Sequence, residues 1–263
     1  MTEATAATPK KILEVEDITL RFGGVTAIDG VGFHVNEGEL FAVIGPNGAG
    51  KTSVFNSISQ VYRPQEGDIR WKGESIMGHR PDAVANLGIA RTFQNIALFP
   101  QMTVIDNILT GRHIRMNGSW FQGMKWFGAG KKEEMENREK VEEIIDFLEI
   151  NQWRKFPVAL LPYGFQKRVE LARALAMEPE LLLLDEPVAG MNLEETEDMA
   201  RFILDIREEL GISIIMVEHD MGLVMDIADR ILVVDFGKPI GTGLPDEVQA
   251  NPDVIAAYLG AEI

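Results

Sequence analysis

The sequence contains no cysteine among its 263 residues. Disulfide frameworks, cysteine-ligated metal sites and thiol nucleophiles are therefore excluded. Histidine is also scarce, with four residues in the whole chain, so a metal site built from several histidines is not expected. The absence of cysteine fits a reducing compartment such as the cytosol.

Basic residues are in the minority, with 25 Lys and Arg against 41 Asp and Glu and a formal net charge of −16. Such a chain is repelled by nucleic acid and by anionic lipid unless it carries a local basic patch. Long apolar runs are also lacking. The longest one, 210–217, is far shorter than the roughly 18 residues that span a bilayer, so we expect any membrane role to be peripheral. Residues 1–11 are small and polar and predict a disordered tail rather than a signal peptide.

The pattern of apolar residues predicts an α/β fold. Short alternating runs separated by glycine turns predict strands over 12–40, and another strand is expected at 67–71. Continuous apolar runs predict strands buried on both faces, at 40–44, 181–184, 212–217 and 231–235. Helices are expected from Lys51 onward, at 141–148, and at 199–210 with Asn192 as a candidate N-cap. Strands alternating with helices indicate a largely parallel sheet, and residues 94–162, which lack strand signals, predict a helical insertion.

A glycine-rich segment follows the apolar run 40–44 and fits the phosphate-loop pattern G-x-x-x-x-G-K-[ST]. Its residues are Gly45, Pro46, Asn47, Gly48, Ala49, Gly50, Lys51 and Thr52. Glycines let the backbone approach phosphate oxygens closely, and the N–H groups of the loop and of the following helix hold the anion. Lys51 is expected to reach the β- and γ-phosphates, and the Thr52 hydroxyl is expected to ligate Mg²⁺.

Two carboxylates and a histidine follow two other buried strands. Asp185 and Glu186 end the run 181–184, and His219 follows the run 212–217. In open α/β sheets, ligands bind at the carboxyl ends of parallel strands. We therefore expect Asp185 to bind Mg²⁺, Glu186 to act as general base on an attacking water, and His219 to hydrogen-bond the γ-phosphate.

Further segments resemble the motifs of ABC ATPases. Residues 161–168, Leu-Pro-Tyr-Gly-Phe-Gln-Lys-Arg, resemble the family's signature motif. Gln94 resembles its Q-loop glutamine, residues 189–192 its D-loop, and Phe22 the aromatic residue that stacks on adenine. The resemblance implies a P-loop NTPase fold with a mixed sheet core, an N-terminal antiparallel β subdomain and an inserted helical subdomain. The core would comprise 12–93 and 163–263, and the helical subdomain 94–162.

The resemblance also implies roles for single residues. Catalysis would depend on Glu186, His219 and Gln94, and Mg²⁺ would be held by Thr52, Gln94 and Asp185. ATP would contact Phe22, the phosphate loop and Ser53. The residues that face the ATP of a second subunit would be Pro162, Tyr163, Gly164, Phe165 and Gln166.

Several short segments narrow the resemblance to the ATP-binding subunits of branched-chain amino acid importers, the LivG type. These segments are 21–24, 91–94, 163–164, 218–221 and 251–260. The resemblance implies an identical or related second ATPase subunit, transmembrane permease subunits and, indirectly, a periplasmic or extracellular solute-binding protein. It implies a cytoplasmic, peripheral position on the inner face of the cell membrane.

The signature departs from the usual motif, because Pro162 replaces a serine and the bulky Tyr163 follows it. Proline offers neither a hydroxyl nor an N–H. Our hypothesis is that the partner-side site capped by this chain is slower, whereas the site of Glu186 remains competent. Asn192 stands where the D-loop usually has aspartate.

Other functions remain open from the sequence. Close alternatives are the ATPase of a urea or short-amide importer and that of a lipopolysaccharide-export system, and a more distant one is a soluble regulatory or repair ABC protein. Residues 111–132 hold five basic residues, no acidic one and several aromatics. No nucleic-acid partner is expected from this segment, because the rest of the chain is strongly acidic and no stacking motif is present. A solvated loop, or a contact with permease or lipid headgroups, is expected instead.

Overall fold

The computed structural model describes residues 9–94, 96–115 and 129–259. It divides into two compact units, one of Met1–Val84 with Leu204–Ile263 and one of Ala85–Ile203. Most of the expected tail and most of the basic, aromatic segment 111–132 lie outside the described residues. Within the described residues, no helix has both the length and the apolarity needed to cross a membrane.

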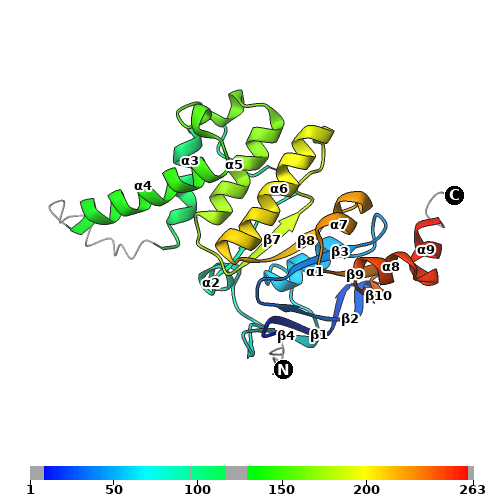
Figure 1. Ribbon diagram of the computed structural model, residues 1–263. Coiled ribbons are helices and arrows are strands. Elements are labelled where there is room, and N and C mark those ends of the chain that lie inside the picture. Colours follow the sequence, from blue (N-terminus) through cyan, green and yellow to red (C-terminus); the bar gives the residue numbers. More distant parts are fainter. Residues whose placement is uncertain (1–8, 95, 116–128, 260–263) are drawn as a thin grey trace, which may run out of the picture. The chain divides into compact units, whose positions relative to one another are not determined.

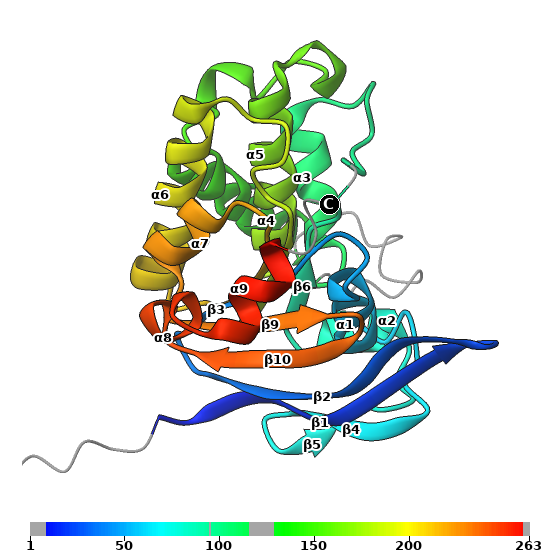
Figure 2. The same cartoon turned by 90° about the vertical axis from the view of Figure 1, so that its right-hand side faces the viewer.

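An antiparallel sheet begins the first unit, with strand order β2-β1-β4-β5 (Figure 2). Its strands are β1 (Lys11–Phe22), β2 (Val25–Asn36), β4 (Glu66–Trp71) and β5 (Glu74–Ser75). Most apolar side chains of β1 and β2, except those at the turn that joins them, are buried, and the intervening residues are largely exposed or half-buried, as expected for a sheet with one face on a core. At Gly67 (φ +88°), a Cβ atom would lie 2.4 Å from the Glu16 carbonyl oxygen, so β4 approaches β1 more closely than a side chain permits.

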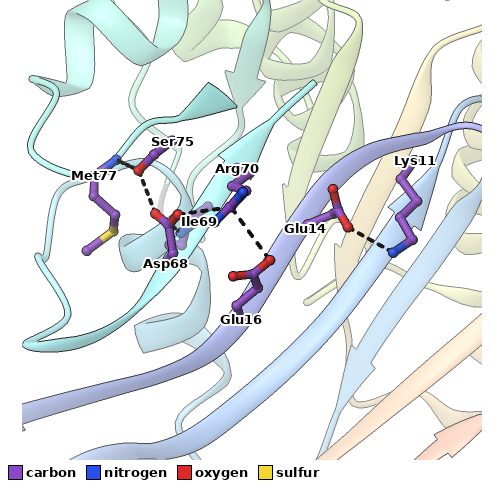
Figure 3. A network of polar contacts seen from close by, with 8 residues as sticks. All are labelled: Lys11, Glu14, Glu16, Asp68, Ile69, Arg70, Ser75 and Met77. Atoms are coloured by element: carbon purple, nitrogen blue, oxygen red, sulfur yellow. Dashed lines mark hydrogen bonds and ion pairs between the residues drawn. The ribbon is translucent and has the colours of Figure 1, made fainter. Parts of the chain in front are cut away.

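Polar side chains cover the exposed face of this sheet (Figure 3). Asp68 accepts hydrogen bonds from Arg70 Nε at 3.0 Å and from Ser75 Oγ at 2.5 Å. On β1, Lys11 donates to Glu14 at 2.8 Å, and this contact lowers the pKa of the Glu14 carboxyl. These contacts are exposed or only partly buried, so each adds little to stability.

The second sheet of this unit carries the phosphate loop. Its strands run in the order β10-β9-β3-β8, with β8 and β9 parallel to β3 and β10 antiparallel to β9. These strands are β3 (Leu40–Ile44), β8 (Ser213–Val217), β9 (Arg230–Asp235) and β10 (Lys238–Gly243). Every residue of β3 and β8 is buried, which confirms the interpretation of their unbroken apolar runs. The helices are α1 (Lys51–Ile58), α7 (Met221–Ile227), α8 (Pro245–Gln249) and α9 (Pro252–Leu259), of which α8 and α9 lie beside β10 (Figure 2).

The second unit combines two short parallel strands with helices (Figure 1). Strand β6 (Ile89–Arg91) pairs with β7 (Leu181–Asp185). The helices and 3-10 turns are α3 (Val104–Arg112), α4 (Ala129–Phe147), η1 (Asn151–Trp153), η2 (Val158–Leu160) and α5 (Tyr163–Leu175). Helix α3 packs against α4 and α5. The short helix α2 (Pro81–Asn86) and the long helix α6 (Leu193–Leu210) pass from one unit to the other along the chain.

Both expected helix faces are present. In α4 and the turn that follows it, Val141, Ile145 and Leu148 are fully buried. In α6 the apolar face is buried from Met199 to Ile206, but Leu210 at the helix end is 49% exposed, so the apolar face expected over 199–210 ends before Leu210. Asn192 caps α6 as expected: Asn192 Oδ1 accepts from the Glu195 N–H at 3.0 Å, and the Glu195 carboxylate accepts from the Asn192 N–H at 3.1 Å.

Candidate nucleotide-binding and hydrolysis site

The phosphate loop joins β3 to α1, the strand-to-helix context that the motif requires. Lys51, the first residue of α1, is 93% buried, and its ammonium donates to the carbonyl oxygens of Gly45 (2.6 Å) and Pro46 (3.0 Å). The ammonium is therefore held inside the curve of the loop. Thr52, one residue further on, is exposed, so its hydroxyl is accessible to a ligand.

Two glycines of the loop are required by close backbone contacts. A Cβ atom on Gly45 would lie 2.0 Å from the Val234 carbonyl oxygen, and one on Gly50 would lie 2.6 Å from the Ala27 carbonyl oxygen. Gly50 also has φ +103°, a conformation that residues with side chains rarely adopt. The loop backbone is thus pressed against β9 at Gly45 and against β2 at Gly50. Such a cradle fits the phosphates of a nucleotide.

Aromatic residues stand at two points of the same unit. Phe22, at the end of β1, is 47% exposed and packs edge-to-face on Tyr62, with ring centroids 5.0 Å apart. An exposed, supported ring of this kind offers a face to a purine. Tyr258 of α9 has its hydroxyl buried beside the Gly45 backbone, and burial raises the pKa of Tyr258 to about 12. Sequence reasoning had assigned Tyr258 no role at the loop.

His219 lies at the same sheet edge as the phosphate loop. Strands β3 and β8 are parallel with Val43 opposite Val217, so the loop after Ile44 and the residues after Val217 emerge side by side. The His219 side chain is 57% exposed, and its Nδ1 lies 3.8 Å from the buried Glu218 carboxylate. Glu218 also accepts from the His219 backbone N–H at 3.0 Å, which fixes the backbone that presents the ring.

In the second unit, the chain segments that follow β6 and β7 bring Gln94 and Glu186 together. The two strands are parallel, with Arg91 opposite Leu183, so Gln94 and Glu186 emerge at one edge. The Gln94 side-chain amide donates to Glu186 Oε2 at 2.9 Å. Glu186 has φ +50°, a strained conformation for a residue with a side chain, of the kind found at functional sites.

Asp185 is buried at the end of β7 and has one oxygen to spare. Its Oδ2 accepts from the Arg91 guanidinium at 2.7 Å, and the two side chains are 2% and 9% exposed. Among the described residues, Asp185 Oδ1 is buried without a hydrogen-bond partner. An unsatisfied carboxylate oxygen at this position fits a hard cation such as Mg²⁺.

Arg91 is the residue of this site that sequence reasoning missed. In the sequence it is only the first residue of the segment 91–94, which contributes to the family resemblance. In the structure it pairs with Asp185 and stacks over the Phe93 ring, with its guanidinium 5.3 Å from the ring centroid. Its neighbour Thr92 accepts from the Asp185 N–H at 3.3 Å through Oγ1. The signal available in the sequence was a charged residue at the end of an apolar segment, because a buried arginine requires a partner of opposite charge.

The signature segment forms the N-terminus of α5. Pro162 is the N-cap without a side-chain hydrogen bond, and Tyr163, 43% exposed, is the first helical residue. The Tyr163 ring lies against Gly190, where a Cβ would be 3.3 Å from it, so the signature meets the D-loop segment. Phe165 turns toward Trp153, with ring centroids 5.5 Å apart, and Gln166 donates to the Leu161 carbonyl at 2.8 Å. Of these residues, Tyr163 is the one that presents a large exposed side chain.

The predicted site residues fall into two sets. The phosphate loop, Phe22 and His219 belong to the first unit, and Gln94, Asp185, Glu186 and the signature belong to the second. Within the second unit Gln94 contacts Glu186, and within the first the loop after β3 and the residues after β8 emerge side by side.

Comparison with known proteins identifies the family. The family model described as ABC transporter matches residues 28–189. This chain belongs to the ABC transporter family of ATPases. A second model, described as branched-chain amino acid ATP-binding cassette transporter, matches residues 238–263, which include α8, α9 and Tyr258.

The similar proteins match nearly the whole length of this chain. The high-affinity branched-chain amino acid transport ATP-binding protein BraF of Pseudomonas aeruginosa is 41% identical over 95% of this chain and 98% of its own length. The corresponding protein LivG of Escherichia coli K12 is 37% identical over 95% and 98%. Among solved structures, the ADP conformation of the ABC transporter cassette MJ1267 is 31% identical, covers 95% of this chain and 99% of its own, and has a TM-score of 0.83. The expected ABC ATPase fold, with a mixed sheet and an N-terminal antiparallel sheet, is confirmed.

Proposed function

We propose that this ABC ATPase binds and hydrolyses ATP to power a branched-chain amino acid importer through separate permease subunits. The observation that carries the proposal is the contact between the Gln94 amide and the Glu186 carboxylate, 2.9 Å apart at one sheet edge. It supports a hydrolytic centre in a chain whose relatives along its full length are named as branched-chain amino acid transport proteins.

The proposed chemistry assigns one task to each residue. The phosphate loop holds the triphosphate, with Lys51 at the β- and γ-phosphates, and Phe22 stacks on the base. Glu186 takes a proton from the attacking water, and Gln94 orients that water and the Glu186 carboxylate. His219 donates to the γ-phosphate. In the second unit Asp185 Oδ1, and in the first the Thr52 hydroxyl, are the oxygen atoms that would each be available to Mg²⁺, whose charge would neutralise the charge that develops on the phosphate oxygens.

A second subunit would complete the site. The amide N–H groups at the start of α5 suit a phosphate presented by a partner, as the resemblance implies for Pro162 to Gln166. Tyr163 is the exposed ring of that segment and would lie at the contact. Because its sequence leaves the choice open, the partner is either a second copy or a related ATPase.

A groove next to the Gln94 loop is the proposed docking place for the permease. The cavity measures about 420 Å³ and lies between α3, α5 and the residues after β6. Arg91, Phe93, His113, Arg173 and Met177 are among its lining residues. A lining that combines apolar side chains with His113 and Arg173 suits a short permease segment that carries apolar and acidic side chains. This docking would keep the chain peripheral on the cytoplasmic face of the membrane.

Hydrolysis is tested with Glu186→Gln in the complete transporter complex. The substitution keeps the shape of the side chain but removes the base, so the turnover number is expected to fall by roughly 10²–10⁴-fold while ATP binding persists. Glu194→Gln, at an exposed position in the first turn of α6, is the matched control and is expected to keep full turnover. Undiminished ATPase activity in Glu186→Gln would show that Glu186 is not the general base.

The transported substrate is tested by uptake in cells that lack the chromosomal copy of this ATPase. Loss of radiolabelled leucine uptake, restored by the wild-type chain but not by Glu186→Gln, is the expected result. Loss of urea uptake instead would assign the chain to a urea importer. Normal uptake of both with a defective outer membrane would assign it to lipopolysaccharide export.

A further inference from the structure

Two charged side chains of α5 are buried at the end of the signature segment 161–168 and just beyond it. Lys167 is 4% exposed and Glu170 is 2% exposed, and Lys167 Nζ lies 3.9 Å from Glu170 Oε2. Nothing assigns either of them a role in nucleotide binding or hydrolysis. Removing such charges from water costs several kcal/mol per ion, and their mutual attraction rarely exceeds this cost.

Both side chains point at the backbone of the segment that carries Gln94. Lys167 Nζ donates to the Gln94 carbonyl oxygen at 3.2 Å. Glu170 Oε1 accepts from the backbone N–H of Phe93 at 3.4 Å and from that of Ala97 at 3.5 Å. The two charges therefore hold the loop on both sides of Gln94, with the ammonium on a carbonyl and the carboxylate between two amide groups.

Stability alone does not explain this pair. A buried ion pair replaced by apolar residues of similar volume commonly leaves a protein as stable as before or makes it more stable. Burial raises the pKa of the Glu170 carboxyl, although Lys167 and the two amide groups oppose that shift. The carboxyl group thus lies where burial disfavours its charged form, and its contacts there are with backbone amide groups of the loop.

We propose that Lys167 and Glu170 are positioning residues that clamp the backbone at Phe93, Gln94 and Ala97, so that the Gln94 amide meets the Glu186 carboxylate. The inference rests on the role proposed above for Gln94. The Gln94 side chain is exposed, so burial of that side chain does not fix its 2.9 Å contact with Glu186. The position of the Gln94 amide must therefore be set by the backbone of its loop, and contacts from α5 fix that backbone. The same helix begins with the signature segment, so the clamp links the partner-facing residues to the hydrolytic centre.

The test compares Glu170→Ala with Glu170→Gln in the complete transporter complex. Glu170→Ala removes the acceptor for both amide groups, whereas Glu170→Gln keeps a carbonyl oxygen of the same reach. We expect Glu170→Ala to lower kcat on the order of 10-fold with KM for ATP within about two-fold, and Glu170→Gln to restore kcat to within about three-fold of wild type. Glu143→Ala, which removes an exposed carboxylate paired with Lys140 on α4, is the control and should change neither constant.

Hydrogen exchange of the peptide that spans 91–99 provides a direct reading of the loop. The amides of Phe93 and Ala97 should exchange faster in Glu170→Ala and at the wild-type rate in Glu170→Gln. A rise in KM without a loss of kcat, or unchanged exchange in a folded Glu170→Ala, overturns the clamp. If Glu170→Ala does not fold, Lys167→Met, which removes the donor to Gln94, is expected to give the same fall in kcat and faster exchange, and wild-type values there overturn the clamp as well.

A double substitution separates this inference from the proposed role of Gln94. In a Gln94→Ala background, Glu170→Ala should lower kcat no further, because the clamp acts through Gln94. If Gln94→Ala alone leaves hydrolysis unchanged, the proposed role of Gln94 fails. The exchange measurement then still decides whether Lys167 and Glu170 hold the loop.

Discussion

The ion pair between Arg91 and Asp185 permits a quantitative test of how the hydrolytic centre is built. The pair is 2.7 Å apart, joins residues that are 94 positions apart in sequence, and is 9% and 2% exposed. Arg91→Leu removes the cation and leaves the Asp185 carboxylate buried and uncompensated. Breaking one side of such a pair typically costs about 3–5 kcal/mol, which lowers Tm by roughly 6–20 °C in a chain of this size.

The assay is thermal unfolding of the purified chain without nucleotide. The double variant with Arg91→Leu and Asp185→Leu removes both charges, and we expect it to recover most of the lost Tm, because two apolar residues can replace a buried pair. Arg80→Ala is the control. Arg80 and Asp82 form an exposed pair at 2.9 Å, and its loss should cost less than about 1 kcal/mol. A Tm of Arg91→Leu within 2 °C of wild type, or a double variant less stable than the single one, would refute the reasoning.

The remaining predictions concern glycines and one cap. Gly45→Ala places a methyl group 2.0 Å from the Val234 backbone oxygen, so ATP binding measured by calorimetry should be lost. Gly164→Ala meets only the Glu195 side chain, at 2.5 Å from its carboxylate, which can turn away at the cost of its bond to the Asn192 N–H, so Tm should fall by less than about 5 °C. Full ATP binding by Gly45→Ala, or unfolding of Gly164→Ala, would contradict this distinction. Asn192→Ala removes the cap of α6 and should lower the free energy of unfolding measured in urea by about 1 kcal/mol. An unchanged free energy of unfolding would show that the cap does not stabilise the protein.

Local signals were enough to predict the strands that carry the site. Uniform apolar runs gave β3, β7 and β8, since strands buried on both faces leave no polar alternation. Strands β6 and β10 were not predicted. The first has three residues and the second reads Lys-Pro-Ile-Gly-Thr-Gly, so neither shows a periodic pattern. Strand β6 is held by its pairing with β7, and β10 by its pairing with β9. Such pairing is a tertiary effect that local propensity does not encode.

Motifs in the sequence, together with the family resemblance, predicted the residues of the candidate site but not their pairings. Gln94, Asp185 and Glu186 were all expected, and within one unit Gln94 meets Glu186. The partner of Asp185 was not foreseen, because Arg91 lies 94 positions away and only the parallel pairing of β6 with β7 brings it near. The positive φ of Glu186 likewise depends on the surrounding structure, which must offset the strain of that conformation.

The altered signature can be interpreted from the position of Pro162 in the helix. Pro162 is the N-cap of α5, and its carbonyl oxygen accepts from the Gln166 N–H at 3.1 Å, so the helix begins normally at Tyr163. A helix N-terminus has four unpaired N–H groups, from the N-cap through the third helical residue, and proline removes only the first. Those of Tyr163, Gly164 and Phe165 remain to face a phosphate. The expected slowing of the partner-side site therefore reflects a missing serine hydroxyl and one missing N–H, and not the loss of the anion-binding helix end.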